Sequence, residues 1–232
     1  MISPAYESFV NNTCFEIANE GLSDKIESGL KEIKKFWDKI IAFIQKKINQ
    51  FKEAISKILS KVGINIPDAK FTIDGNSYII SMAINTILDS AYVEIQNVKK
   101  EHSNFSYVYL KMQDLEKRIH DPSEFFMAGY SFSEDLCRQC HHANETWVIT
   151  KTQLNKMYKN VNIANMKIKS IQKLINTFTY SDFKDNRLRF SELQSLSNLM
   201  GRISASMVEV STNIGKDAKP ATSKDNNLYS PQ

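Results

Sequence analysis

Residues that break helices are scarce in this sequence. Among 232 residues there are only seven glycines and five prolines. Folds built from sheets need many turns, and glycine and proline are two of the residues that most often form them. The shortage of both therefore argues against a sheet-rich fold and favours long helices. The hydrophobic fraction of 42% is ordinary for a folded protein, and the chain is long enough to bury one good core.

Cysteine is also scarce, and no long apolar run is present. Of the three cysteines, Cys14 lies far in sequence from the close pair Cys137 and Cys140, which argues against a disulfide framework. The first residues include acidic side chains and lack a basic segment, so they do not resemble a secretory signal peptide. The longest uncharged apolar-rich run, residues 75–88, is shorter than the roughly 18–20 residues that span a bilayer. We therefore expect neither a signal peptide nor a transmembrane helix.

The strongest positive signal is a lysine-rich amphipathic pattern over residues 24–62. Its apolar residues recur every three or four positions, which places them on one side of a helix in a band about 80° wide. This window holds ten lysines and five acidic residues, net +5, whereas the other residues together carry net −1. We interpret it as one basic helix, about 58 Å long at ~1.5 Å per residue, that holds the chain's positive balance. The apolar positions are Ile26, Leu30, Ile33, Trp37, Ile40, Ile44, Ile48, Phe51, Ile55, Ile58 and Val62.

Further helices are expected along the rest of the chain. One helix is expected from Ser133 to about Thr179. In its second half, and again in residues 190–214, apolar residues alternate steps of three and four. Such a heptad period predicts two helices paired as an antiparallel hairpin or coiled coil. From Lys216 onward no apolar period remains, and we expect disorder there. Other predicted helices cover about residues 4–19, 77–100 and 104–120, with a brief extended stretch at 71–73.

These elements define an all-α fold. We expect an elongated helical bundle with a long N-terminal amphipathic basic helix, either protruding or docked, and a C-terminal antiparallel helical hairpin. The chain then divides into a candidate targeting peptide, the basic helix, the helical bundle and a disordered tail. Their respective bounds are residues 1–20, 21–63, 64–215 and 216–232.

A cluster of metal-binding residue types occupies residues 137–142, with the sequence CRQCHH. The C-x-x-C-H pattern is that of covalent haem attachment, but this chemistry needs export, for which no signal is present. On a helix, Cys137, Cys140 and His141 share one side and could converge on zinc. Zinc sites usually combine two separated ligand pairs, and only one pair is present here. The alternative, with no cofactor, is that both cysteines pack as small apolar residues of a bundle helix.

No motif for catalysis is found. The sequence contains no G-x-S-x-G elbow and no glycine-rich phosphate loop. A pairing of Cys137 with His141 is possible at helical spacing, but no third group to orient the histidine is evident. We therefore expect a protein that is not an enzyme and takes no small-molecule substrate.

The basic helix allows several uses. Lysines opposite a stripe with aromatic residues fit a helix that lies in a membrane interface. Lysines also neutralise phosphates, so non-specific contact with nucleic acid is an alternative. Packing of the stripe on the rest of the bundle is favoured, because amphipathic helices of globular proteins usually face a core, and self-association is a further use. The residues that we expect to form the interaction surface are Lys34, Lys35, Trp37, Lys46, Lys47 and Phe51.

The N-terminal residues carry a family resemblance. The segment AYESFVNNTCFEIANEG, with Tyr6-Glu7-Ser8-Phe9 in it, resembles the starts of internal and accessory virion proteins of large tailed bacteriophages. Those proteins often begin with a short amphipathic targeting peptide, which a prohead protease removes by cutting after a glutamate. Ala18-Asn19-Glu20 before Gly21 is similar to such a site, although Ala stands where the family has Ile or Leu. The alternative is an ordinary helix followed by a glycine cap.

The resemblance implies a non-enzymatic structural or interaction protein of a tailed-phage virion. Such a protein would be packaged in the capsid interior, or reside in the host cytoplasm, and could be ejected with the DNA. The partners implied are other virion proteins or a second copy of the chain, with non-specific contact to DNA or to an anionic membrane. The alternative function is a membrane-active helical protein whose basic helix binds anionic bilayers.

Overall fold

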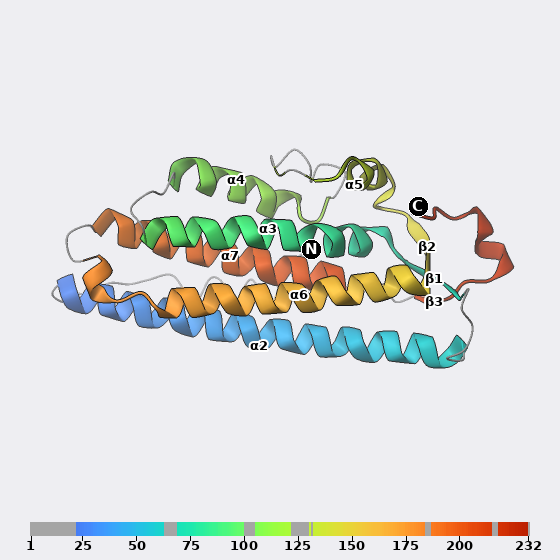
Figure 1. Cartoon of the computed structure of the whole chain (residues 1–232), viewed down its shortest axis with the longest axis horizontal. Coiled ribbons are helices and arrows are strands. Elements are labelled where there is room, and N and C mark those ends of the chain that lie inside the picture. Colours follow the sequence, from blue (N-terminus) through green and yellow to red (C-terminus); the bar gives the residue numbers. More distant parts are fainter. Residues whose placement is uncertain are drawn as a thin grey trace.

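Four long helices run side by side and form the body of the protein in this computed structural model (Figure 1). They are α2 (Leu22–Val62), α3 (Gly75–Lys99), α6 (Lys151–Asn176) and α7 (Arg187–Thr212). The predicted predominance of helix is confirmed, although a small sheet is present as well. The residues that the structure describes are 22–62, 69–99, 105–121, 130, 132–183, 187–214 and 218–231.

The order of the four helices around the bundle is set by which pairs are in contact. α2 packs against α6 and α7, and α3 packs against the same two helices. α2 and α6 are antiparallel, because Asp38 lies beside Gln172 at one level and Phe51 beside Tyr158 at another. α2 and α3 therefore occupy one diagonal of the bundle, and α6 and α7 occupy the other.

This order does not confirm that the two C-terminal helices pair directly as the predicted hairpin. α6 and α7 are consecutive and antiparallel, but they face each other across the diagonal and contact each other far less than they contact α2 and α3. The heptad seams correctly mark the buried side of each helix, yet a seam does not specify which helix covers it. The seam residues that are buried include Leu154, Met157, Val161, Ile168, Ile171, Leu193, Leu196, Met200, Ile203 and Met207.

A three-stranded sheet closes one end of the bundle. Strand β1 (Lys70–Asp74) pairs antiparallel with β2 (Thr146–Thr150) and with β3 (Lys219–Pro220). The expected extended stretch at 71–73 is part of β1. The sheet brings residues from three distant parts of the sequence to the same end of the molecule, where β1 leads directly into α3.

The single helix predicted from Ser133 to about Thr179 is wrong. Helix α5 (Glu134–Gln139) is short, a 3₁₀ turn (Cys140–His142) follows, and β2 precedes α6. The residues of β2 are β-branched or aromatic, which suits a strand better than a helix. Thr150 then starts α6 with a capping box, in which its side chain accepts from the Gln153 amide and the Gln153 side chain accepts from the Thr150 amide.

The disorder predicted for residues 216–232 is also wrong for the described residues 218–231. β3 pairs with β1, a 3₁₀ helix follows (Ser223–Asn227), and the Val148 amide donates to the Tyr229 carbonyl at 2.8 Å. The tail lacks an apolar period because single residues, rather than a helix face, hold it in place. Its ordering comes from strand pairing and from the ring of Tyr229, which lies 4.7 Å from the Trp147 ring.

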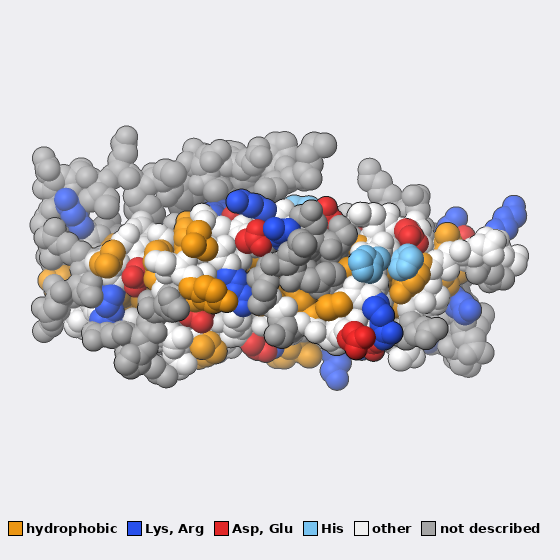
Figure 2. All heavy atoms as spheres, turned by 90° about the horizontal axis from the view of Figure 1, so that it is seen from above, with side chains coloured by type: hydrophobic (Ala, Val, Ile, Leu, Met, Phe, Trp, Pro, Cys, Tyr) orange, Lys and Arg blue, Asp and Glu red, His pale blue; other side chains and the backbone are white. Residues whose placement is uncertain are grey.

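A shorter helix, α4 (Phe105–Arg118), packs on α7. Arg202 of α7 donates to Glu116 of α4 at 2.6 Å and joins the two helices. On the surface that carries α4, acidic, basic and hydrophobic side chains are interspersed (Figure 2). Among the residues that the structure describes, this face therefore has no single sign of charge.

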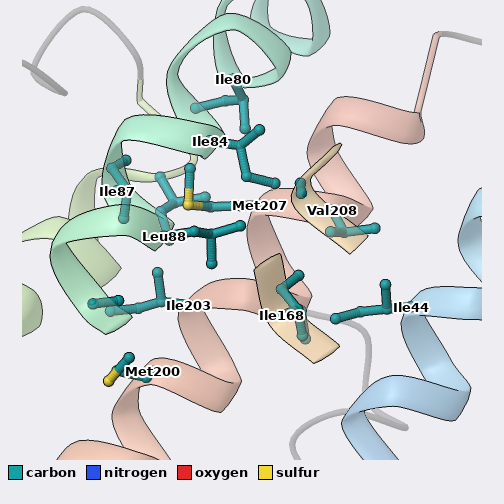
Figure 3. Packing of buried hydrophobic residues seen from close by; sticks show 14 of the residues in the cluster. Ile44, Ile80, Ile84, Ile87, Leu88, Ile168, Met200, Ile203, Met207 and Val208 are labelled. Carbon is teal, nitrogen blue, oxygen red and sulfur yellow. The ribbon is translucent and has the colours of Figure 1, made fainter. Parts of the chain in front are cut away.

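Aliphatic side chains from all four long helices meet in the core (Figure 3). Ile44 of α2, Ile84 of α3 and Ile168 of α6 meet Val208 of α7, and each is buried. α2 and α7 approach closely through two glycines that receive phenylalanine rings. The Phe36 ring lies on Gly201 and the Phe190 ring lies on Gly29, leaving no room for a Cβ at either position. The apolar stripe of α2 is thus part of this core.

Candidate functional site

The residues predicted to form an interaction surface on α2 divide into three groups. Trp37 and Phe51 are 0% and 1% exposed and lie in the core, so they are not available to a partner. Lys34 and Lys47 are half-buried and contact neighbouring elements. Lys35 and Lys46 are exposed on the outer side of the helix. Only the last pair has the position expected of an interaction surface.

The two half-buried lysines attach α2 to the rest of the bundle. Lys34 Nζ donates to the Phe178 carbonyl at 3.3 Å, just beyond the end of α6. Lys47 Nζ forms an ion pair with Glu209 of α7 at 2.7 Å. Because both partners of this ion pair remain partly exposed, we expect it to contribute less than about 1 kcal/mol. These lysines position α2 rather than present charge to solvent.

A second basic helix adjoins α2, and the sequence analysis did not single it out. α6 contains six lysines and no acidic residue, so its net charge is +6. Together α2 and α6 carry sixteen lysines, five acidic residues and no arginine, whereas the complete chain is only +4. The positive charge therefore does not lie in one helix, because the excess in α6 is hidden by acidic residues elsewhere in the chain.

The exposed lysines of the two helices form what we call the lysine face. At about 100° per residue, Lys35, Lys39, Lys46 and Lys57 fall within about 40° of one another around α2. On α6, Lys159, Lys169 and Lys173 fall within about 80°. The complete set of exposed lysines is Lys31, Lys35, Lys39, Lys46, Lys52 and Lys57 on α2, and Lys156, Lys159, Lys169 and Lys173 on α6.

The two rows of lysines are in register with each other. The Asp38–Gln172 hydrogen bond of 2.6 Å and the Phe51–Tyr158 ring pair, 6.3 Å between centroids, align the helices. Lys35 and Lys39 therefore lie level with Lys169 and Lys173, and Lys52 lies level with Lys156 and Lys159. The lysine face thus consists of exposed lysines on two helices, α2 and α6, that lie side by side along the bundle (Figure 1).

The charge is not uniform along α2. Its first part, up to Asp38, mixes four lysines with four acidic residues, whereas the part from Lys39 onward has six lysines and a single acid, Glu53. The half of α2 nearer the sheet is therefore the more positive. Clustered like charges repel and reduce the stability of a compact state unless counter-charge is supplied.

The predicted metal-ligand cluster does not converge. Cys140 is 1% exposed and points into the core, Cys137 is half-buried, and His141 is exposed. They separate because α5 ends at Gln139 instead of continuing as a regular helix. Within the described residues, no group of three or more His, Cys, Asp or Glu side chains is arranged to hold a metal ion.

Two residues of this cluster have structural contacts instead. Burial, with a smaller contribution from nearby Cys137, raises the pKa of the Cys140 thiol from 9.0 to about 12, so it stays protonated. A protonated, buried thiol is a poor nucleophile. His142 stacks on the Tyr229 ring at 4.2 Å between centroids and contacts Glu145 at 2.9 Å. This histidine helps hold the C-terminal tail on the sheet end.

Two further expectations concern the N-terminus and membranes. The predicted processing site, Glu20 and Gly21, lies outside the described residues, as does the candidate targeting peptide. Where the structure does describe helices, none has an apolar stretch of the length needed to cross a bilayer.

Comparison of the chain with protein families, with curated proteins and with solved structures found no match. The lysine face is therefore interpreted from its own residues.

Proposed function

We propose that this protein is a non-enzymatic interaction protein that engages an anionic partner through the lysine face. The observation that carries the proposal is the sixteen lysines against five acidic residues on two neighbouring helices. The apolar sides of both helices are already buried, so their outer sides are the part left for a partner. Repulsion within the face gives a physical reason for such a partner, because counter-charge would relieve it.

The setting that we propose is the head of a tailed-phage virion, with the chain packaged there and able to be ejected with the DNA. Support for this setting comes from the resemblance of Tyr6-Glu7-Ser8-Phe9 and of Glu20-Gly21 to a prohead targeting peptide and its processing site. In that setting the partners would be other virion proteins, a second copy of the chain or the packaged genome. Mass spectrometry of the chain from its native particle tests this: a start at Gly21 is expected, and a start at Met1 would contradict it.

Membrane insertion by α2 is the less favoured alternative. An interfacial helix inserts its apolar face into the boundary of the bilayer. Here that face, with Trp37, Ile44 and Phe51, is in the core, so insertion would require α2 to leave the bundle. Exposing a residue such as Ile44 costs about 1.5–3 kcal/mol, and the stripe contains many such residues.

Two matched variants of the full chain test the proposal. The face variant replaces four exposed lysines of the lysine face by glutamine, and the control variant replaces four exposed lysines elsewhere, so both lose the same charge. The face variant is Lys46→Gln, Lys57→Gln, Lys159→Gln and Lys173→Gln. The control variant is Lys70→Gln, Lys117→Gln, Lys219→Gln and Lys224→Gln.

Binding to a soluble polyanion such as heparin is measured for the wild-type chain and both variants at about 50 mM salt. The face variant is expected to bind at least about tenfold more weakly, and the control variant within about twofold of wild type. Equal losses in both variants would mean that only net charge matters. Circular dichroism and urea unfolding confirm folding, since exposed substitutions change stability by about 0.5 kcal/mol or less.

A further inference from the structure

We infer that the anionic partner of the lysine face is the phosphate backbone of double-stranded DNA, bound without regard to base sequence. This inference rests on the proposed function and names the partner of the same site. It follows from the spacing of the lysines, from the kind of basic residue used and from the absence of exposed rings among them.

The geometry of the face suits an extended, regular polyanion. From Lys31 to Lys57 the exposed lysines of α2 span about 39 Å at ~1.5 Å per residue, slightly more than one turn of B-form DNA, about 34–36 Å. The row on α6, from Lys156 to Lys173, spans about 26 Å beside it. Because the register of the two helices is set by buried contacts, the rows form a rigid surface rather than a flexible tail.

The residue type indicates contact with phosphates rather than with bases. All sixteen basic residues of α2 and α6 are lysines, and neither helix contains arginine. Arginine makes the bidentate contacts that read guanine in the major groove, whereas lysine acts on a phosphate as a point charge. A surface of lysines alone therefore favours binding that does not depend on sequence.

Single-stranded nucleic acid fits less well, because it is bound by exposed aromatic rings on which bases stack. The aromatic residues of α2 and α6 are engaged with the protein. Phe36, Trp37 and Phe51 are buried, Tyr158 packs against Phe51, and Phe43 is half-buried beneath Lys47 Nζ at 5.4 Å. No ring on the described part of these helices is left as an exposed stacking platform.

An anionic bilayer fits less well for a related reason. Stable binding to a membrane surface combines lysines with apolar side chains that enter the interface. On the described residues of α2 and α6, the exposed large hydrophobic side chain is Met166 alone, 60% exposed. A bilayer would therefore offer the lysine face only electrostatic attraction.

The experiment measures binding of the full chain to fluorescent duplexes of about 24 base pairs, in two unrelated sequences, by anisotropy at several salt concentrations. The same chain is also tested with single-stranded DNA of equal length and with vesicles of equal parts phosphatidylglycerol and phosphatidylcholine. If about five phosphates are neutralised, log K falls with log salt with slope about −4.5, or about 500-fold between 50 and 200 mM. The two duplexes should bind equally, and the face variant should bind at least about tenfold more weakly with a shallower slope.

The outcomes separate the inference from the proposed function. If the chain binds single-stranded DNA or vesicles more tightly than duplex DNA, and the face variant loses that binding, the inference of a duplex partner is overturned. The proposed function, an anionic partner of the lysine face, would stand. A preference for one of the two duplex sequences also overturns the inference as stated. No binding to heparin, to nucleic acid or to vesicles at about 50 mM salt overturns the proposed function and the inference together.

Discussion

The two pairs of helices in this bundle, α2 with α6 and α3 with α7, share one core but differ on their outer sides. Inside, both pairs contribute aliphatic residues with almost no exposure (Figure 3). Outside, α2 and α6 carry net +11, whereas α3 and α7 carry four basic and four acidic residues. The same bundle packing therefore accommodates outer sides of different charge, and the proposed function is based on that difference.

The interiors of the two pairs also differ in polarity. α3 and α7 bury several serines, among them Ser77, Ser81, Ser197, Ser204 and Ser211, whereas no buried serine is found in the described parts of α2 and α6. Serine hydroxyls inside a helix can donate to the carbonyl of the preceding turn, as Ser81 does to Tyr78 and Ser211 to Val208. α3 and α7 therefore bury serine hydroxyls, whereas the described serines of α2 and α6 remain exposed.

The largest expected effect comes from truncating matched core residues of the two pairs. Ile44→Ala in α2 and Ile84→Ala in α3 should each lower the free energy of unfolding by about 2–5 kcal/mol, because both side chains are buried and leave cavities. Urea unfolding measures both. A near-zero effect of Ile44→Ala alone would break the comparison, because it would mean that α2 is not part of the shared core.

A somewhat smaller effect is expected where α2 meets α7. The Cβ of Gly201→Ala would lie 2.3 Å from a ring carbon of Phe36, and this overpacking should cost about 1–3 kcal/mol. In a Phe36→Ala background the same substitution should be neutral or stabilising, since alanine is favoured over glycine within a helix by about 1 kcal/mol. Urea unfolding of the four chains gives the coupling. Equal effects in both backgrounds would show that the ring does not lie on Gly201.

The three-stranded sheet closes one end of the bundle. A substitution of Tyr229 tests whether the C-terminal tail packs there. Tyr229→Ala removes the ring that stacks on His142 and packs on Trp147, and should cost about 1–2 kcal/mol. Lys224→Ala in the same tail is the control and should change stability by less than about 0.5 kcal/mol. Hydrogen exchange adds a local readout, because loss of the ring should expose the Val148 amide, which donates to the Tyr229 carbonyl. Unchanged exchange there would contradict the contact.

The effect that is smallest near neutral pH, and that grows only under alkaline conditions, is a dependence of stability on pH. The folded chain keeps the Cys140 thiol protonated up to a pKa of about 12, whereas the unfolded chain releases that proton near the ordinary value of 9.0. The unfolded state therefore binds fewer protons between these values, and the free energy of unfolding should fall as pH rises from about 9 to 12. Cys140→Ala should show a smaller decline over the same range, while Cys137→Ala, which removes only the minor contribution to the raised pKa, should lie closer to wild type. Identical declines in Cys140→Ala and wild type would contradict the raised pKa.

The parts of the fold that the sequence predicts well are those in which one helix face carries the signal. The stripe from Ile26 to Ile58 and the seam from Leu154 to Ile175 are buried, as their periodicities indicate. Periodicity does not identify the covering partner, which is why α6 and α7 were expected to pair directly. The single helix expected from Ser133 to about Thr179 also extended across the break at residues 140–150, where the β-branched residues of β2 and the Thr150 cap favour a strand followed by a new helix.

Of the lysine face, the sequence analysis identified the lysines on α2 and missed those on α6. Lys35 and Lys46 were identified because the surrounding window has an evident charge excess. Lys159 and Lys173 were missed because the acidic residues of other segments cancel the lysines of α6 when the rest of the chain is summed. Counting charge over each heptad-bearing segment would have found them. That α6 lies beside α2 could not be derived from either segment, since it depends on the diagonal arrangement of the bundle.

The most direct test of the central claim is a lysine-acetylation footprint of the full chain, with and without a duplex of about 24 base pairs at about 50 mM salt. Mass spectrometry reports the modification rate of each lysine. The account predicts that duplex DNA slows acetylation of Lys46, Lys57, Lys159 and Lys173 at least about threefold. It also predicts unchanged rates at Lys70, Lys117, Lys219 and Lys224, which lie outside the lysine face. Equal protection of both sets, or protection of the second set alone, would contradict a binding surface on α2 and α6.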